Sequence, residues 1–203
     1  GSPKNEPCRV NSEDQFTNTL TRSLAVMETE VTRQMWADLA AFRPELPPDP
    51  TEPSTGGTPA HPVQQVTWYE AMLYANLLSL ERGLERCYWT DASKSVAIDA
   101  SNHTVGPFWC DFDASGYRLP TEGEWEHFAR AGTTGAFFVA VPEYDADTCA
   151  GPAPVGVFPT LDDVAWFAHW DREGAANSPE CSRPVGRKAA NPWGLRDVLG
   201  NVA

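Results

Sequence analysis

The 203-residue sequence is poor in basic residues and has no long apolar run. It contains 15 Lys and Arg against 28 Asp and Glu, which gives a formal net charge of -13. Nucleic-acid binding is therefore not expected, because contacts to phosphates need clustered basic side chains. The longest apolar runs, such as Ala136–Val141, are far shorter than the roughly 20 residues that cross a bilayer. The sequence predicts an acidic globular protein without a membrane span.

Cysteines are few, and none of them forms a C-x-x-C pair, which excludes a zinc ribbon or a thioredoxin-like motif. The five are Cys8, Cys87, Cys110, Cys149 and Cys181. Two disulfides with one cysteine left over can be drawn in about fifteen ways, and spacing alone does not choose among them. Scattered cysteines favour an exported, secreted or periplasmic protein; the alternative is a cytosolic protein with buried thiols.

Tryptophan, proline and glycine are abundant instead. Eight Trp, 18 Pro and 15 Gly predict much irregular backbone held by large aromatic side chains. No repeat of 20–50 residues is present, and Gly1-Ser2 is typical of a cloning remnant. We predict a disordered segment over residues 1–15 and a single loop-rich α+β domain over residues 16–203.

Three helix starts are predicted from capping residues. Thr32 is the predicted N-cap of a helix that continues to Phe42 and ends before Pro44. Its expected apolar stripe is Met35, Trp36, Leu39 and Phe42. The proline-rich residues 44–62 are expected to form a loop.

Two capping boxes, 67–70 and 121–124, predict the next two helices. Their expected buried faces are Trp68, Ala71, Ala75 and Leu78 in one helix, and Trp125, Phe128 and Ala129 in the other. Short strands are expected within residues 20–26 and between Cys87 and Cys110.

Catalytic motifs are scarce. The chain has no G-x-S-x-G, P-loop or G-x-G-x-x-G motif, and its four histidines are far apart in sequence. Oxygen-rich segments could instead supply ligands to Ca²⁺, although each alone is also typical of a turn. They are Asp145-Ala146-Asp147, Asp162-Asp163, Asn177 and Asp197 to Asn201.

Several motifs together resemble the formylglycine-generating enzyme, or sulfatase-modifying factor, family. They are Glu30-Val31-Thr32, His61-Pro62-Val63 with Val66-Thr67-Trp68, Gly116-Tyr117-Arg118-Leu119-Pro120-Thr121-Glu122 with Glu124-Trp125-Glu126, Arg183-Pro184-Val185-Gly186, and Asn191-Pro192-Trp193-Gly194-Leu195 with Asp197 and Gly200-Asn201-Val202. The resemblance spans residues 20–203 and implies a C-type-lectin-like fold with few short helices and strands. It also implies a Cys87–Cys110 disulfide, with Cys149–Cys181 as the next pair.

The resemblance implies structural calcium as well. Asp197, Gly200 and Val202 correspond to one site, with a side-chain ligand from Asp197 and carbonyl ligands from the other two. Asn177 corresponds to a ligand of a second site, for which Asp163 is a looser candidate.

The resemblance stops short of the family's catalytic part. The family motif continues with Trp-Glu-Trp, whereas this chain ends at Ala203, where the first Trp would stand. The family's catalytic cysteine pair, which binds Cu(I) and uses O₂ to oxidise the cysteine of a Cys-x-Pro-x-Arg peptide, lies beyond that point. We therefore expect no catalytic residue in this chain, and copper only where the C-terminal part is present.

Two functions remain open from the sequence. The first is a non-catalytic, calcium-stabilised scaffold that binds a protein or peptide partner, which includes its own C-terminal fragment. The second is the N-terminal part of a copper-dependent oxidase. A third family member type, the iron-dependent sulfoxide synthase, needs an additional helical domain that nothing here resembles.

Overall fold

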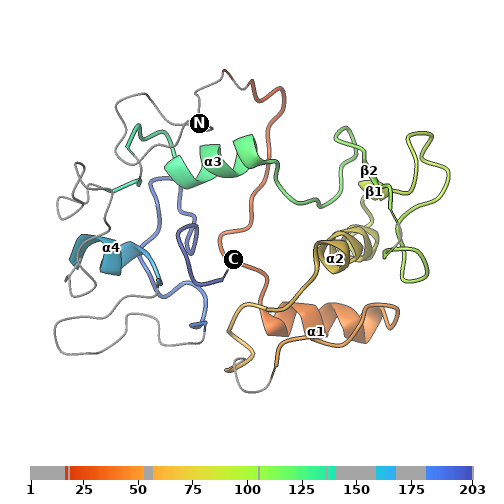
Figure 1. Cartoon of the computed structure of the whole chain (residues 1–203), viewed down its shortest axis with the longest axis horizontal. Helices are drawn as coiled ribbons and strands as arrows, with labels where there is room; N and C mark the ends of the chain where they lie inside the picture. Colours follow the sequence, from red (N-terminus) through yellow and green to blue (C-terminus); the bar gives the residue numbers. More distant parts are fainter. Residues whose placement is uncertain are drawn as a thin grey trace. The chain divides into compact units, whose positions relative to one another are not determined.

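The computed structural model describes residues 17, 19–52, 57–104, 106–135, 137–139, 159–167 and 182–202. These residues fall into two compact units (Figure 1). One unit is residues 31–120, and the other combines residues up to Glu30 with those from Thr121 onward. The predicted disordered segment 1–15 lies outside the described residues, and the single domain over 16–203 stays a prediction. No helix among the described residues is long and apolar enough to cross a membrane.

In the unit of residues 31–120, two capped helices lie against each other. The first, α1, covers Arg33–Phe42, and the predicted N-cap Thr32 accepts a hydrogen bond from the Met35 N–H at 3.1 Å. The second, α2, covers Trp68–Glu81 and begins with the predicted capping box. Their contact is a hydrophobic cluster in which Trp36 stacks on Tyr74 with ring centroids 5.0 Å apart. Both helix starts are confirmed.

The predicted buried faces of these helices are only partly right. In α1, Trp36 and Leu39 are buried, whereas Met35 is 39% exposed and Phe42 is 70% exposed. In α2, Trp68 is 56% exposed, and the buried positions run nearly all round the helix from Met72 to Leu77. The helical spacing of apolar residues predicts a single buried face, so it could not predict that other segments cover α2 on more than one side.

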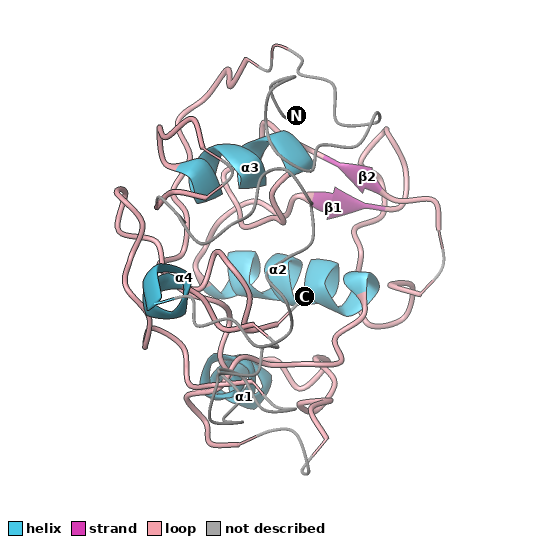
Figure 2. Ribbon diagram, turned by 60° about the vertical axis from the view of Figure 1, so that its left-hand side comes forward, coloured by secondary structure: helices cyan, strands magenta, loops and turns pink. Residues whose placement is uncertain are grey.

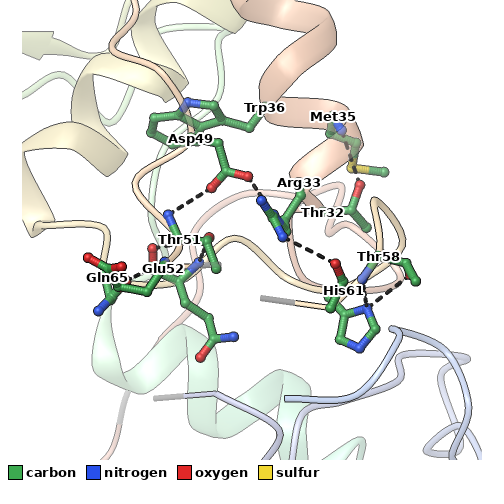
Figure 3. Close-up of polar contacts among 12 residues, drawn as sticks. Thr32, Arg33, Met35, Trp36, Asp49, Thr51, Glu52, Thr58, His61 and Gln65 are labelled. Carbon is green, nitrogen blue, oxygen red and sulfur yellow. Dashed lines mark hydrogen bonds and ion pairs between the residues drawn. The ribbon is translucent and has the colours of Figure 1, made fainter. Parts of the chain in front are cut away.

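Proline-rich residues 44–52 are held against α1 by polar contacts (Figure 3). The Arg33 guanidinium pairs with the Asp49 carboxylate at 2.5 Å, and Asp49 accepts a hydrogen bond from the Thr51 N–H at 2.9 Å. Burial alone would raise the pKa of Asp49, but Thr51 and Arg33 more than offset this and lower it. The indole N–H of Trp36 donates to the Pro47 carbonyl at 2.9 Å. Residues 44–52 of the predicted loop are thus a fixed part of this unit.

Among the described residues, two strands form one short antiparallel pair (Figure 2). Strand β1 is Tyr88–Trp89 and β2 is Trp109–Cys110, and the register places Cys110 opposite Tyr88. Cys87 is therefore one position out of register with Cys110, and the predicted disulfide between them is not formed. Side chains alternate between faces along a strand, so cysteines offset by one residue do not meet as an opposed pair.

The Gly-Tyr-Arg-Leu-Pro motif crosses closely over the end of α2. A Cβ atom on Gly116 would lie 1.9 Å from the Glu85 carbonyl oxygen and 2.5 Å from Ser79 Oγ, so only glycine fits. The Tyr117 N–H donates to Ser79 Oγ at 2.8 Å, and the Leu119 N–H donates to the Tyr88 hydroxyl at 2.8 Å. The motif therefore contacts both the end of α2 and Tyr88 of β1.

The second unit contains α3, Glu122–Arg130, and α4, Pro159–Val164. The capping box of α3 is confirmed, with the Thr121 N–H donating to Glu124 Oε2 at 2.8 Å. Trp125 was expected to face inward and is 50% exposed, while Glu124 is 7% exposed. The strand expected in residues 20–26 is not formed, and α4 was not predicted. The strand error has a simple cause, since three alternating apolar residues do not supply a partner strand.

Asn76 is the central polar side chain of the unit of residues 31–120. It is fully buried in α2, and its amide N–H groups donate to the carbonyls of Tyr88 at 2.8 Å and Ile98 at 3.0 Å. Its Oδ1 accepts from the backbone N–H groups of Cys87 at 3.2 Å and Tyr88 at 3.0 Å. One amide therefore binds four backbone groups of the segments around the short ladder; the Tyr88 carbonyl also accepts from the Ile98 N–H at 3.0 Å.

We expect Asn76→Ala to lower the free energy of unfolding by about 3 kcal/mol or more, because the Cys87 and Tyr88 N–H groups and the Ile98 carbonyl lose the side-chain partner that Asn76 gives them. Urea unfolding followed by circular dichroism measures this. Leu80→Ala is the matched control in the same helix, since Leu80 is 37% exposed, and it should cost less than about 1 kcal/mol. Equal losses in the two variants would contradict the role given to Asn76.

Candidate functional site

The predicted calcium ligand Asp197 is a buried carboxylate with one unsatisfied oxygen. It lies on a left-handed turn with φ 55° and is 8% exposed. Its Oδ2 accepts a hydrogen bond from the Gly186 N–H at 2.6 Å, whereas its buried Oδ1 has no hydrogen-bond partner. Burial raises the pKa of Asp197, and the hydrogen bond from Gly186 and the charge of Arg196 offset this only in part. A bare, buried carboxylate oxygen is unfavourable unless something binds it.

A second carboxylate, Glu30, lies close enough to Asp197 for the two charges to interact. Burial raises the pKa of Glu30 to about 7, the hydrogen bond from Asn201 lowers it, and the charge of Asp197 raises it again. Asn201 Nδ2 donates to Glu30 Oε2 at 2.7 Å, and the Val202 backbone donates to the same carboxylate. Two acidic side chains are thus gathered beside the Gly200-Asn201-Val202 segment.

The backbone at Gly200 is fixed by a close contact with Trp166. The two residues form an isolated parallel bridge, and the Asn201 N–H donates to the Trp166 carbonyl at 3.0 Å. A Cβ atom on Gly200 would lie 1.8 Å from that carbonyl oxygen, and φ at Gly200 is 84°. Glycine is therefore required here both by space and by backbone conformation. The motif containing Gly200 and Val202 is held beside Asp197 by this contact.

The residues predicted for a second calcium site are not gathered in the same way. Asp163 lies in α4, its side chain is exposed, and its carbonyl accepts from the Ala189 N–H at 2.9 Å. In the described part of the chain, no hydrogen bond or ion pair joins its side chain to Asp197 or Glu30. Asn177, Asp145 and Asp147 lie outside the described residues.

Glu30 is the site residue that sequence reasoning missed. Its hydrogen-bond partner Asn201 is 171 positions away in the sequence, and no spacing rule joins residues so far apart. In the sequence, Glu30 is part of the Glu-Val-Thr motif, and this motif predicts only that a helix begins after it.

The chemistry of this cluster suits a hard divalent cation. It offers an orphan carboxylate oxygen from Asp197, a second carboxylate from Glu30, and the backbone of a tightly turned segment. Ca²⁺ takes 6–8 oxygen ligands in flexible geometry, so this donor set fits it. Among the described residues there is no group of three or more His, Cys, Asp or Glu side chains that could hold a metal. Backbone carbonyls and solvent would have to complete the coordination.

The described histidines have other roles. His61 Nδ1 accepts a hydrogen bond from the Thr58 N–H at 2.9 Å (Figure 3). His127 meets Trp193 edge to face, with ring centroids 4.8 Å apart. His103 is half-buried at a turn, and its Nδ1 lies 3.1 Å from the Ala100 carbonyl oxygen. His169 lies outside the described residues.

Comparison with known proteins gives the family. The family described as the sulfatase-modifying factor enzyme 1-like domain matches residues 5–203. The chain belongs to this family. The resemblance inferred from the motifs is therefore confirmed, and so is the loop-rich α+β fold of the formylglycine-generating enzyme type.

Three relatives show how far the similarity extends. The chain is 29% identical to the chaperone protein LppX of Paenibacillus barcinonensis over 186 residues, which are 85% of this chain and 58% of LppX. It is 37% identical to the formylglycine-generating enzyme of Mycobacterium tuberculosis over 90 residues, 43% of this chain and 26% of that protein. The structure of PvdO from Pseudomonas aeruginosa matches with a TM-score of 0.60 and 22% identity, over 98% of this chain and 62% of PvdO. The PvdO match supports the fold alone, and the chain spans less than two thirds of each relative.

The acidic pair predicts an unusual dependence of stability on pH. Because the pKa of Glu30 is about 7 in the folded chain against 4.5 ordinarily, the folded state binds more protons than the unfolded state between these values. Without divalent cations, stability should therefore fall as pH rises from about 4.5 to 7. Urea unfolding in EGTA across this range measures the trend.

Glu30→Gln should flatten this dependence, since glutamine keeps an acceptor for Asn201 and does not ionise. Glu28→Gln is the control, because the Glu28 side chain is 67% exposed, and it should leave the slope unchanged. A wild-type profile that rises steadily through this range, unaffected by Glu30→Gln, would contradict the assignment.

Proposed function

We propose that this chain is a calcium-stabilised, non-catalytic binding scaffold of the sulfatase-modifying factor family. The observation that carries the calcium part is the buried Asp197 Oδ1, which has no hydrogen-bond partner. A cation supplies what this oxygen lacks, and it also screens the repulsion between Asp197 and Glu30. Neither effect requires any change in the hydrogen bonds already described.

In this proposal Asp197 is the side-chain ligand, and the carbonyls of Gly200 and Val202 are backbone ligands. Glu30 adds a nearby negative charge and links the segment before α1 to the C-terminal motif through Asn201. Calcium would therefore stabilise contacts between parts of the chain that are far apart in sequence. The second site, with Asp163 and Asn177 as ligands, has no comparable support, because the Asp163 side chain is exposed.

The binding role is supported by the relative that covers more of this chain. LppX is named a chaperone protein, and its similarity extends over 85% of the chain. A chaperone binds other protein chains, so a protein or peptide is the partner class we propose here. An extracytoplasmic, secreted or periplasmic location belongs to the same proposal, with the scattered cysteines as its support. So does the Cys149–Cys181 disulfide, whose two cysteines lie outside the described residues.

Calcium binding is tested by isothermal titration of the chelator-treated chain at pH 7.5. We expect saturable binding of Ca²⁺ and a rise in the unfolding midpoint, since a ligand at 100 times its Kd adds about 2.7 kcal/mol of stability. Asp197→Asn should weaken binding at least tenfold, because the charged ligand is lost while the size is kept.

Asp163→Asn is the matched comparison for the second site. If Asp197 carries the binding, Asp163→Asn should change the affinity less than twofold. Absence of a calcium-dependent shift in wild type at millimolar Ca²⁺, or equal losses in the two variants, would refute the proposed first site.

The runner-up function is the N-terminal part of a copper-dependent formylglycine-generating oxidase. The observation that favours it is 37% identity over 90 residues to the formylglycine-generating enzyme of Mycobacterium tuberculosis. Cu(I) prefers paired thiolates. One observation speaks against copper at Cys87. This cysteine is fully buried and burial raises its pKa, which disfavours the thiolate form that Cu(I) would need.

The two functions differ in a peptide assay. The chain of 203 residues, supplied with Cu(I), O₂ and a reductant, should leave a Cys-x-Pro-x-Arg peptide unoxidised, as mass spectrometry of the peptide would show. The Mycobacterium tuberculosis enzyme is the positive control. Conversion of the peptide cysteine to formylglycine by this chain would overturn the non-catalytic proposal and support the oxidase.

A further inference from the structure

Two buried hydrogen-bond donors next to one indole ring have no acceptor. They are the Trp166 Nε1–H and the Arg183 Nε–H. Both atoms are buried in this structure, and each carries the cost of an unmade hydrogen bond. One donor is on the edge of the indole ring and the other belongs to a guanidinium that lies over the same ring, and a pair of unsatisfied donors calls for an explanation beyond packing.

The same ring is contacted by two cationic side chains. The Arg183 guanidinium carbon lies 5.6 Å from the Trp166 ring centroid, and Lys188 Nζ lies 3.7 Å from it. In the described part of the chain neither cation forms an ion pair, although Lys188 Nζ donates to the Asp162 carbonyl and feels the charges of Asp162 and Asp163. Two like charges in contact with one indole repel each other, and an anion between them would relieve this.

The backbone around this cluster is already fixed. Asn201 accepts a hydrogen bond from the Arg183 N–H at 2.8 Å and donates to the Arg183 carbonyl at 3.1 Å. The Asn201 N–H also donates to the Trp166 carbonyl at 3.0 Å. One asparagine thus fixes the backbone of both residues that carry the orphan donors, which reduces the ordering needed when a ligand binds.

We propose that Trp166, Arg183 and Lys188 form an oxyanion-binding site. Its ligand is a compact group with two or more acceptor oxygens, which could come from free phosphate or from the carboxylate of a peptide. Charge-assisted hydrogen bonds to such oxygens are the strong ones, and Arg and indole N–H groups both donate well to them. The proposal is independent of the proposed calcium site, because it uses none of that site's ligands.

Isothermal titration of the full chain in EGTA, at constant ionic strength set with NaCl, tests this site. The probes are inorganic phosphate and N-acetylglutamate amide, which distinguish the two sources of the oxyanion. We expect saturable binding of at least one probe. Trp166→Phe keeps the aromatic ring but removes the N–H donor, and it should weaken binding about tenfold. Arg187→Met, which removes an exposed arginine of the same segment, should change the affinity less than twofold.

Two results would count against the oxyanion site. Failure of both probes to bind wild type up to tens of millimolar would overturn the proposal, as would equal effects of Trp166→Phe and Arg187→Met. If Trp166→Phe does not fold, Lys188→Met replaces it, with the same expected loss of affinity. Because both oxyanion titrations contain EGTA, their result does not depend on whether the chain binds calcium.

Discussion

Buried side-chain amides hold this fold together in place of a β-ladder. The described chain has only one pair of two-residue strands, so most loop carbonyls and N–H groups need other partners. Asn76 supplies four such bonds in one unit. In the other unit, Asn191 donates to the Phe128 carbonyl at 2.7 Å and accepts from the N–H groups of Trp193 and Leu195. Asparagine suits this task because one amide both donates and accepts.

Asn201 makes the same kind of amide hydrogen bonds at the two candidate sites. It fixes the Trp166 and Arg183 backbones and also binds the Glu30 carboxylate. The acidic pair and the basic indole cluster therefore share one organising side chain. In a fold built mainly of loops, individual side-chain hydrogen bonds set the backbone positions. Acidic and basic groups can therefore be held near each other by one shared side chain.

Sequence reasoning was strongest where structure is local. The capping residues Thr32, Thr67 and Thr121 begin helices as expected, because a cap needs only the next three residues. The faces of those helices were less predictable, since burial depends on what covers them. Trp68 and Trp125 are exposed where an apolar stripe placed them inside. The prediction of a Cys87–Cys110 disulfide is wrong in this structure. Strand register decides which residues face each other, and the sequence spacing of two cysteines does not determine that register.

The sequence by itself determined the family and the loop-rich α+β class, because these depend on ordered motifs and composition. Only the tertiary structure decided that Glu30 lies beside Asp197, that Asp163 is exposed, and that Trp166 and Arg183 hold unsatisfied donors. The reason is physical: burial raises the energy of a charge or an unpaired donor, and burial is created by residues from distant parts of the chain.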